Sequence, residues 1–294
     1  MTGAEEGVLL LCCSLGMSEP RPLTMAQFRT LGSRVRASRM DGDSLSDVTS
    51  HDLERLGYRE EDAVRISVLL RRERALHAYL SAGEARGIYP ITRVSPAYPV
   101  KISSKQRLSA TPVLFAHGDA ALLTQPSVSL VGSRRLNPKN EYFAQVIGEL
   151  AARDGLVLVS GGAEGADSVA QEACLEHGGS CIIFVADRLM DHRPHPRVLY
   201  ISEDGYDLPF SPARALHRNS LIHMQGDRVF AAQCTYGSGG TWKGCMDNLA
   251  HHWSDLYVYN DGSDAMEALK SQGAMGMKFP TNLFDLHNPQ QSLF

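Results

Sequence analysis

Apolar residues change their spacing along this chain of 294 residues. Up to about residue 85 they recur every three or four positions, which is typical of helices with one buried face. Thr24 and Gln27 form a capping-box pattern, which predicts a helix that begins there and runs through Val35. Further helices are expected over residues 50–56 and 61–80. The first part of the chain is therefore predicted to be a compact helical module.

From residue 127 onward, short apolar runs alternate with segments of helical periodicity. The apolar runs predict strands over residues 127–131, 156–159, 181–185, 198–201, 229–232 and 256–259. The helical segments are expected over residues 138–154, 166–177, 211–223, 241–251 and 263–272. This alternation predicts an α/β fold, namely a Rossmann-like doubly wound parallel sheet.

Composition along the chain predicts the domain boundaries. Residues 1–85 are expected to form a small helical domain, and residues 120–275 the Rossmann-like domain. Residues 86–119 contain four prolines and are expected to be an irregular connector with a short strand near residues 113–116. Residues 276–294 form a tail without clear periodicity, which is expected either to be loose or to pack on a neighbour.

Composition and charge narrow the class of protein. Hydrophobic residues make up 43% of the chain, which is enough for a sizeable core, and the net charge of −4 provides no global attraction to nucleic acid. The six cysteines form no CxxC pair, so reduced thiols in a cytoplasmic protein are expected. The apolar residues 8–13 follow Glu5 and Glu6 and are too few to span a bilayer, so no signal peptide and no membrane association are expected.

Three predicted strands each end in a glycine-rich turn that opens a helix. Glycine lets backbone amides approach a ligand, and a helix N-terminus carries partial positive charge. In a parallel sheet such turns share one edge, so together they predict a site for an extended anion. The residues concerned are Gly132, Ser133 and Arg134, then Ser160, Gly161, Gly162 and Gly165, then Gly237, Ser238, Gly239, Gly240 and Thr241.

Individual charged residues near these turns have different expected roles. The Arg134 guanidinium is suited to pair with a phosphate. Asp167 is expected to cap the following helix and fix the second turn, and Glu164 to face solvent. Arginines at positions 71, 72 and 74 are expected to form a solvated face. A basic, exposed loop is expected to carry His192, His195, Arg188, Arg193 and Arg197.

The sequence lacks the patterns expected of several enzyme classes. The first turn is not a GxGxxG fingerprint, and the third turn does not have P-loop spacing, since Lys243 follows Thr241. No serine or cysteine lies in a nucleophile elbow, and the histidines are scattered. A non-catalytic protein without cofactor or metal is therefore expected.

These motifs resemble the DNA-processing protein A (DprA/Smf) family over roughly residues 20–275. The matching segments, in order, are Tyr98-Pro99, Gly132-Ser133-Arg134, Ser160-Gly161-Gly162-Ala163 with Gly165-Ala166-Asp167, Ser202-Glu203, Arg218-Asn219 and the turn at Ser238-Gly239. The resemblance implies a Rossmann-like domain preceded by a small SAM-like helical domain. It also implies a homodimer that binds and protects single-stranded DNA and aids a RecA-type recombinase during transformation.

The resemblance also assigns residues to a DNA groove, with some departures from the family pattern. The implied groove residues are Ser133, Arg134, Gly161, Gly162, Arg218 and Asn219, with Arg188 as a neighbour. Gln171 stands where a histidine is usual, and Trp242-Lys243 where small residues are usual. The loop around Arg188 also differs, the usual Pro-Gly after the last strand is replaced by Asn260-Asp261-Gly262, and no winged-helix tail follows. These features indicate a divergent member.

Two other functions compete with DNA binding. The fold is shared with phosphoribohydrolases that carry PGGxGTxxE, and the comparable stretch here, residues 239–247, contains no glutamate. Binding of a small nucleotide stays open, with or without N-glycosidic hydrolysis, although hydrolysis is disfavoured. Trp242 either stacks on a base or packs in the fold. In the remaining alternative, the glycine turns are simple corners of a partner-binding protein.

Overall fold

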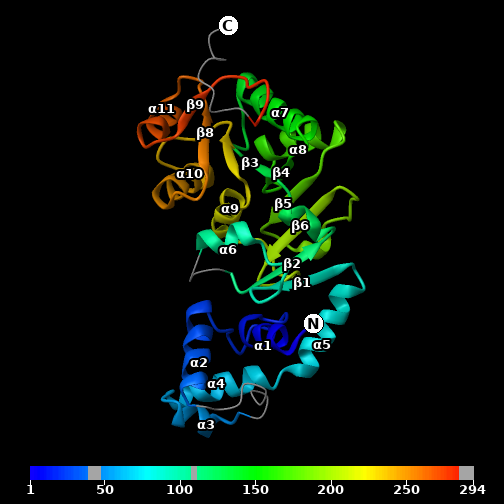
Figure 1. Cartoon of the computed structure of the whole chain (residues 1–294), viewed down its shortest axis with the longest axis vertical. Helices are drawn as coiled ribbons and strands as arrows, with labels where there is room; N and C mark the ends of the chain where they lie inside the picture. The colour runs from blue at the N-terminus through cyan, green and yellow to red at the C-terminus, as the bar shows by residue number, and fades with distance from the viewer. Residues whose placement is uncertain (39–47, 107–110, 285–294) are drawn as a thin grey trace. The chain divides into compact units, whose positions relative to one another are not determined.

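The computed structural model describes residues 1–38, 48–106 and 111–284 (Figure 1). Contacts divide the chain into two compact units. The first consists of Met1–His117, Asp187–Arg193 and Ser202–Pro209, and the second of Gly118–Ala186, Pro194–Ile201 and Phe210–Phe294.

Most of the first unit is helical. Its helices are α1 (Gly3–Cys12), α2 (Met25–Ala37), α3 (Ser50–Arg55), α4 (Glu60–Leu70), α5 (Glu73–Glu84) and α6 (Val100–Gln106). The apolar residues 8–13 are all buried and form the centre of this unit. No helix among the described residues combines the length and the apolar character needed to cross a bilayer.

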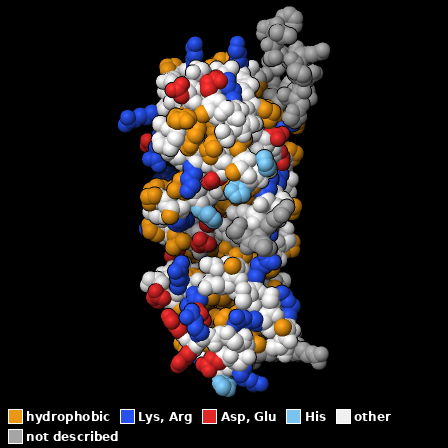
Figure 2. Space-filling view, turned by 90° about the vertical axis from the view of Figure 1, so that its left-hand side faces the viewer, with side chains coloured by type: hydrophobic (Ala, Val, Ile, Leu, Met, Phe, Trp, Pro, Cys, Tyr) orange, Lys and Arg blue, Asp and Glu red, His pale blue; other side chains and the backbone are white. Residues whose placement is uncertain are grey.

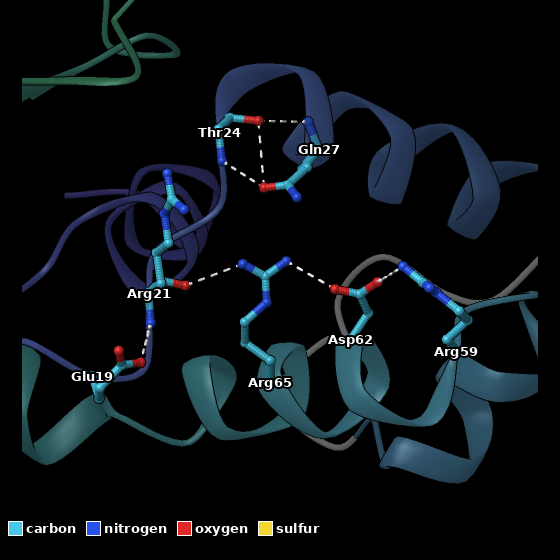
Figure 3. Close-up of polar contacts among 7 residues, drawn as sticks. All are labelled: Glu19, Arg21, Thr24, Gln27, Arg59, Asp62 and Arg65. Carbon is cyan, nitrogen blue, oxygen red and sulfur yellow. Dashed lines mark hydrogen bonds and ion pairs between the residues drawn. The ribbon is translucent and has the colours of Figure 1, made fainter.

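The predicted capping box at the start of α2 is confirmed (Figure 3). The Gln27 backbone N–H donates to Thr24 Oγ1 at 3.3 Å, and the Thr24 N–H donates to Gln27 Oε1 at 3.0 Å. On α4, the Arg65 guanidinium donates to Asp62 Oδ1 at 3.1 Å (Figure 3). These local bonds satisfy polar groups at the surface of the helical unit.

The single helix predicted over residues 61–80 is wrong, because the chain breaks into α4 and α5 there. The Arg71 backbone N–H bonds to the Val68 carbonyl at 3.2 Å in a tight terminal turn, and Arg72 leaves the helical conformation. The apolar periodicity continues across this break, so the sequence pattern does not reveal it.

Arg72 explains why the break is there. Its side chain is 6% exposed, and its guanidinium donates to the Cys13 carbonyl at 2.9 Å and to the Leu10 carbonyl. Both oxygens lie at the C-terminal end of α1, where a helix leaves carbonyls without intrahelical partners. The predicted solvated arginine face is therefore correct for the exposed Arg71 and Arg74 and wrong for Arg72.

A nine-stranded sheet runs in the order β1-β2-β6-β5-β4-β3-β7-β8-β9. β1 pairs with β2 antiparallel, whereas the pairs that join β5, β4, β3, β7, β8 and β9 are parallel. The strands are β1 (Ile88–Thr92), β2 (Val113–His117), β3 (Ser127–Val131), β4 (Val157–Ser160), β5 (Cys181–Val185), β6 (Val198–Glu203), β7 (Arg228–Ala231), β8 (Asp255–Tyr259) and β9 (Met275–Met277). The predicted Rossmann-like fold is confirmed.

β1, β9 and α6 are elements that the sequence pattern did not predict. β1 lies in the segment expected to be irregular, and its Pro90 interrupts the apolar run. Proline lacks an N–H and is tolerated in edge strands, and β1 is the edge of this sheet. β9 is only three residues long, and Gly276 stands between its two methionines, so it gives a weak signal.

Helices of the second unit cover both faces of the sheet (Figure 1). They are α7 (Pro138–Arg153), α8 (Ala166–Glu176), α9 (Pro212–Gln225), α10 (Gly239–His251) and α11 (Asp264–Ser271). From β3 the chain moves through β4 to β5, whereas from β7 it moves through β8 to β9 in the opposite direction. With right-handed crossovers, α7 and α8 therefore cover one face and α10 and α11 the other. The direction reverses between β3 and β7, which is where ligands bind in such sheets.

The described part of the tail packs on its own unit. Leu283 is fully buried, and its backbone N–H donates to Asp154 Oδ2 at 2.7 Å. Its carbonyl accepts from Arg228 Nη1 at 2.8 Å. Residues 285–294 lie outside the described residues, so the expectation of a loose or neighbour-bound tail remains a prediction for them.

We expect Arg72→Ala to lower the free energy of unfolding by about 3 kcal/mol, because buried carbonyl oxygens lose a charged donor. Arg74→Ala removes the same charge from an exposed position and should change stability by less than about 0.5 kcal/mol. Urea denaturation of both variants measures the difference. Equal effects of the two substitutions would show that Arg72 does not hold α1 in place.

Candidate functional site

The three glycine turns lie at the carboxyl ends of β4, β3 and β7, which are neighbours in the sheet. A cavity of about 840 Å³ opens beside them at the point where the strand order reverses. Its lining includes many of the residues predicted from the sequence, namely Gly132, Ser133, Arg134, Arg218, Asn219, Gly237, Ser238, Gly239, Gly240 and Thr241. The structure therefore brings the first and third turns together with α9.

Hydrogen bonds tie the first turn to the segment that joins β7 to α10 and to the start of α10. The Ser133 backbone N–H donates to the Gln233 carbonyl at 2.9 Å, and its hydroxyl donates to the same oxygen at 3.2 Å. The Thr241 hydroxyl donates to the Gly132 carbonyl at 3.0 Å. The two predicted hydroxyls thus position the backbone of the turns, and each retains lone pairs that can accept from a ligand.

Asp167 organises the second turn. Its carboxylate, 7% exposed, accepts from the backbone N–H of Gly161 at 3.0 Å and of Ala163 at 3.4 Å. The predicted role in fixing this loop is confirmed, but the predicted capping of α8 is wrong, because its N-cap residue is Gly165. Glu164 is exposed, as expected.

Arg218 lies over this loop and is buried. Its Nη1 donates to the Phe184 carbonyl at 2.7 Å and to the Gly161 carbonyl. Burial raises the pKa of the Asp167 carboxyl, while Arg218 and the two loop amides act in the opposite direction. Arg218 therefore connects the carboxyl ends of β4 and β5 to α9, in addition to lining the cavity.

Gly165 allows the second turn to pack against the first. Its φ is +87°, and a Cβ there would lie 2.5 Å from the carbonyl oxygens of Ser133 and Arg134. The Ala166 backbone N–H also donates to the Ser133 carbonyl at 3.2 Å. Here glycine allows the close fit between the two turns.

Two of the cations around the cavity are exposed. The lining contains Arg134, Arg218 and Lys243 against a single carboxylate, that of Asp167. Arg218 lies beside Asp167, so the local surplus of positive charge comes from the exposed Arg134 and Lys243. On the molecular face shown in Figure 2, basic and acidic side chains are interspersed.

The N-terminus of α10 also faces the cavity. Ser238 is its N-cap residue and makes no side-chain capping bond, and Gly239, Gly240 and Thr241 follow in the first turn. The backbone amides of a first turn have no intrahelical acceptor and carry partial positive charge. Together with the two exposed cations, they favour an anionic group in this cavity.

Some predicted residues lie elsewhere. Ser160 is buried and its hydroxyl bonds to Gln171, whereas Gly162 is exposed in the second turn. Neither they nor Gly161 and Gly165 line the cavity. Arg188 belongs to the first unit, where its Nε lies 3.6 Å from Asp191 Oδ2.

Several lining residues were missed by the sequence argument. They are apolar or aromatic and include Phe210, Pro212, Leu216 and Met246. Phe210 is 54% exposed, which a sequence does not reveal. Within the part of the chain that the structure describes, no group of three or more histidine, cysteine or acidic residues is arranged to hold a metal ion.

A doubly wound sheet with a cavity at its switch point, lined by glycine turns and exposed cations, defines a Rossmann-like protein with a cavity suited to an anionic ligand. The chain belongs to the DNA recombination-mediator protein A family, because the model of that family matches residues 90–243, more than half of the sequence. Members of this family take part in DNA processing as binding proteins without catalysis. The predicted family and the prediction of a non-enzymatic protein are thus confirmed.

Solved structures agree with this assignment. DNA processing protein A from Streptococcus pneumoniae matches with a TM-score of 0.61 and 22% identity, over 87% of this chain and 95% of that one. DNA processing protein A from Helicobacter pylori, which binds single-stranded DNA, matches with a TM-score of 0.54 and 25% identity, over 64% and 90%. A comparison with curated protein sequences gives no match.

We expect Asp167→Ala to lower the free energy of unfolding by about 3 kcal/mol, since it leaves two loop amides and the buried Arg218 uncompensated. Glu164→Ala removes a carboxylate from the same loop at an exposed position and should cost less than about 0.5 kcal/mol. Chemical denaturation followed by circular dichroism measures both. A small effect of Asp167→Ala would mean that this carboxylate is not needed to hold the turn.

Proposed function

We propose that this chain binds single-stranded DNA at the carboxyl edge of its sheet, without catalysis, and thereby protects incoming DNA. The observation that carries the proposal is the switch-point cavity, where the exposed Arg134 and Lys243 adjoin the N-terminus of α10. A phosphate placed there meets two full positive charges and the partial charge of a helix end.

A nucleic-acid backbone suits this site better than a compact anion. The turns after β3 and β7 are adjacent, so their positive groups lie along an edge and not at one point. Phosphates recur along a strand, and single strands bind where a positive groove follows the backbone. The family's role in DNA processing and the single-stranded DNA bound by the Helicobacter pylori protein support the choice of ligand.

The proposal extends to assembly and partners. We infer that the protein acts as a homodimer and aids the loading of a RecA-type recombinase, as the family resemblance implies. Light scattering measures the first property in solution. Strand exchange by a recombinase, with and without this protein, measures the second. A monomer, or exchange that is unaffected by the protein, would restrict the proposal to DNA binding.

We expect Arg134→Ala to weaken binding of a labelled oligo-dT about tenfold, because one phosphate contact is lost. Affinity of the parent should fall steeply with salt, and the substitution should reduce the slope of log affinity against log salt by about 1. Fluorescence anisotropy at two salt concentrations measures both quantities.

Arg29→Ala is the matched control, since it removes an equal charge from an exposed position on α2 in the other unit. It should leave the affinity for oligo-dT unchanged. If the parent does not bind oligo-dT at low salt, the DNA proposal is wrong, and a small nucleotide becomes the better candidate ligand.

A small nucleotide is the second candidate because the cavity volume of about 840 Å³ lies within the range of small-molecule sites. We expect no release of free base from nucleoside monophosphates, because Asp167, the one carboxylate in the lining, is bonded to loop amides. Chromatography after incubation tests this expectation. Release of base that is abolished by Asp167→Asn would assign the protein to the hydrolases.

A further inference from the structure

An exposed tyrosine lies at the tip of the turn that precedes α10. The Ser238 backbone N–H donates to the Thr235 carbonyl at 3.3 Å, which closes a four-residue turn with Tyr236 and Gly237 at its centre. Gly237, the third residue of this turn, has a φ of +69°, a conformation that glycine adopts without steric cost. The Tyr236 side chain is 62% exposed, so the fold does not use it as core.

Trp242 stands beside this tyrosine. The two ring centroids are 5.0 Å apart in an edge-to-face arrangement. Trp242 lies in the first turn of α10, lines the cavity and is half-buried. Its aromatic neighbour is itself mostly exposed, so their contact adds little to the hydrophobic core. The aromatic pair is therefore held at the rim of the cavity by a tight turn and a helix start.

Cations border the same pair. Lys243 follows Trp242 directly and is exposed. Arg134 lines the same cavity from the glycine turn that follows β3. Phe210, 54% exposed, adds a further aromatic surface to the lining. Aromatic faces beside phosphate-binding cations are the combination that holds single strands, because bases stack while the backbone is neutralised.

We propose that Tyr236 and Trp242 form a base-stacking platform, so that the site requires an unpaired base next to a phosphate. The ligand class is thus a single strand with accessible bases, and duplex DNA is disfavoured because its bases are already stacked. This inference rests on the proposed function and adds that part of the affinity comes from the bases and not from the backbone alone.

Intrinsic fluorescence tests the platform directly. The chain contains two tryptophans, and Trp253 lies after the other end of α10, where it stacks on His251. In Trp253→Phe protein, Trp242 is the single reporter, and we expect oligo-dT to quench it. An abasic oligonucleotide of equal length and charge should leave the fluorescence unchanged and bind about tenfold more weakly.

Substitutions separate stacking from charge. Trp242→Leu should weaken oligo-dT binding about tenfold and leave abasic binding unchanged, whereas Trp242→Phe should keep most of the affinity. Tyr236→Ala, at an exposed position, should act in the same direction as Trp242→Leu without affecting the melting temperature. Trp253→Phe alone should leave both affinities unchanged.

The outcomes distinguish this inference from the proposed function. Equal affinity for oligo-dT and the abasic strand, without quenching, would overturn the platform and leave single-stranded DNA binding intact. Failure of both strands to bind would overturn the proposed function and the platform with it. Tighter binding of duplex than of oligo-dT would also overturn the platform.

Discussion

The buried carboxylate of Asp167 is the interaction on which the candidate binding edge depends. It holds the amides of the second turn, and it compensates the buried Arg218, whose guanidinium joins the carbonyls of Gly161 and Phe184. Through Arg218 the ends of two strands are connected to α9, which forms one wall of the cavity. A binding edge that is rigid before the ligand arrives loses less conformational entropy on binding.

The order of the sheet explains why the charge of the whole chain says little about its ligand. The net charge is −4, yet the strand reversal between β3 and β7 gathers Arg134, Lys243 and a helix N-terminus around one cavity. Electrostatic attraction is strongest within a Debye length, so such a local group acts on a phosphate more than distant surface carboxylates do. A protein with mixed surface charge can therefore bind an anion at a defined place.

The sequence was sufficient for the central parallel strands, because their apolar runs are continuous and their turns carry glycine. The sequence was insufficient for β1, because Pro90 interrupts the apolar run of this edge strand. It was also insufficient for the break at Arg72, because the apolar periodicity continues across it. Within the site, the glycine turns were predictable by their position after strands. The burial of Arg218 was not, since an arginine that binds a carbonyl and one that binds a phosphate look alike in a sequence. Tyr236 was missed for a similar reason, because its exposure depends on the turn that carries it.

The bonds that tie the first turn to the segment after β7 and to the start of α10 join residues far apart in the chain. Ser133 and Gln233 are separated by 100 positions, and Gly132 and Thr241 by 109. Contacts of such long sequence separation close large loops and form late in folding. During synthesis, β3, β4 and β5 can assemble early, but the cavity is completed only after β7 and the start of α10 have been made. A nascent or truncated chain that ends before α10 therefore has much of the sheet but not the complete site.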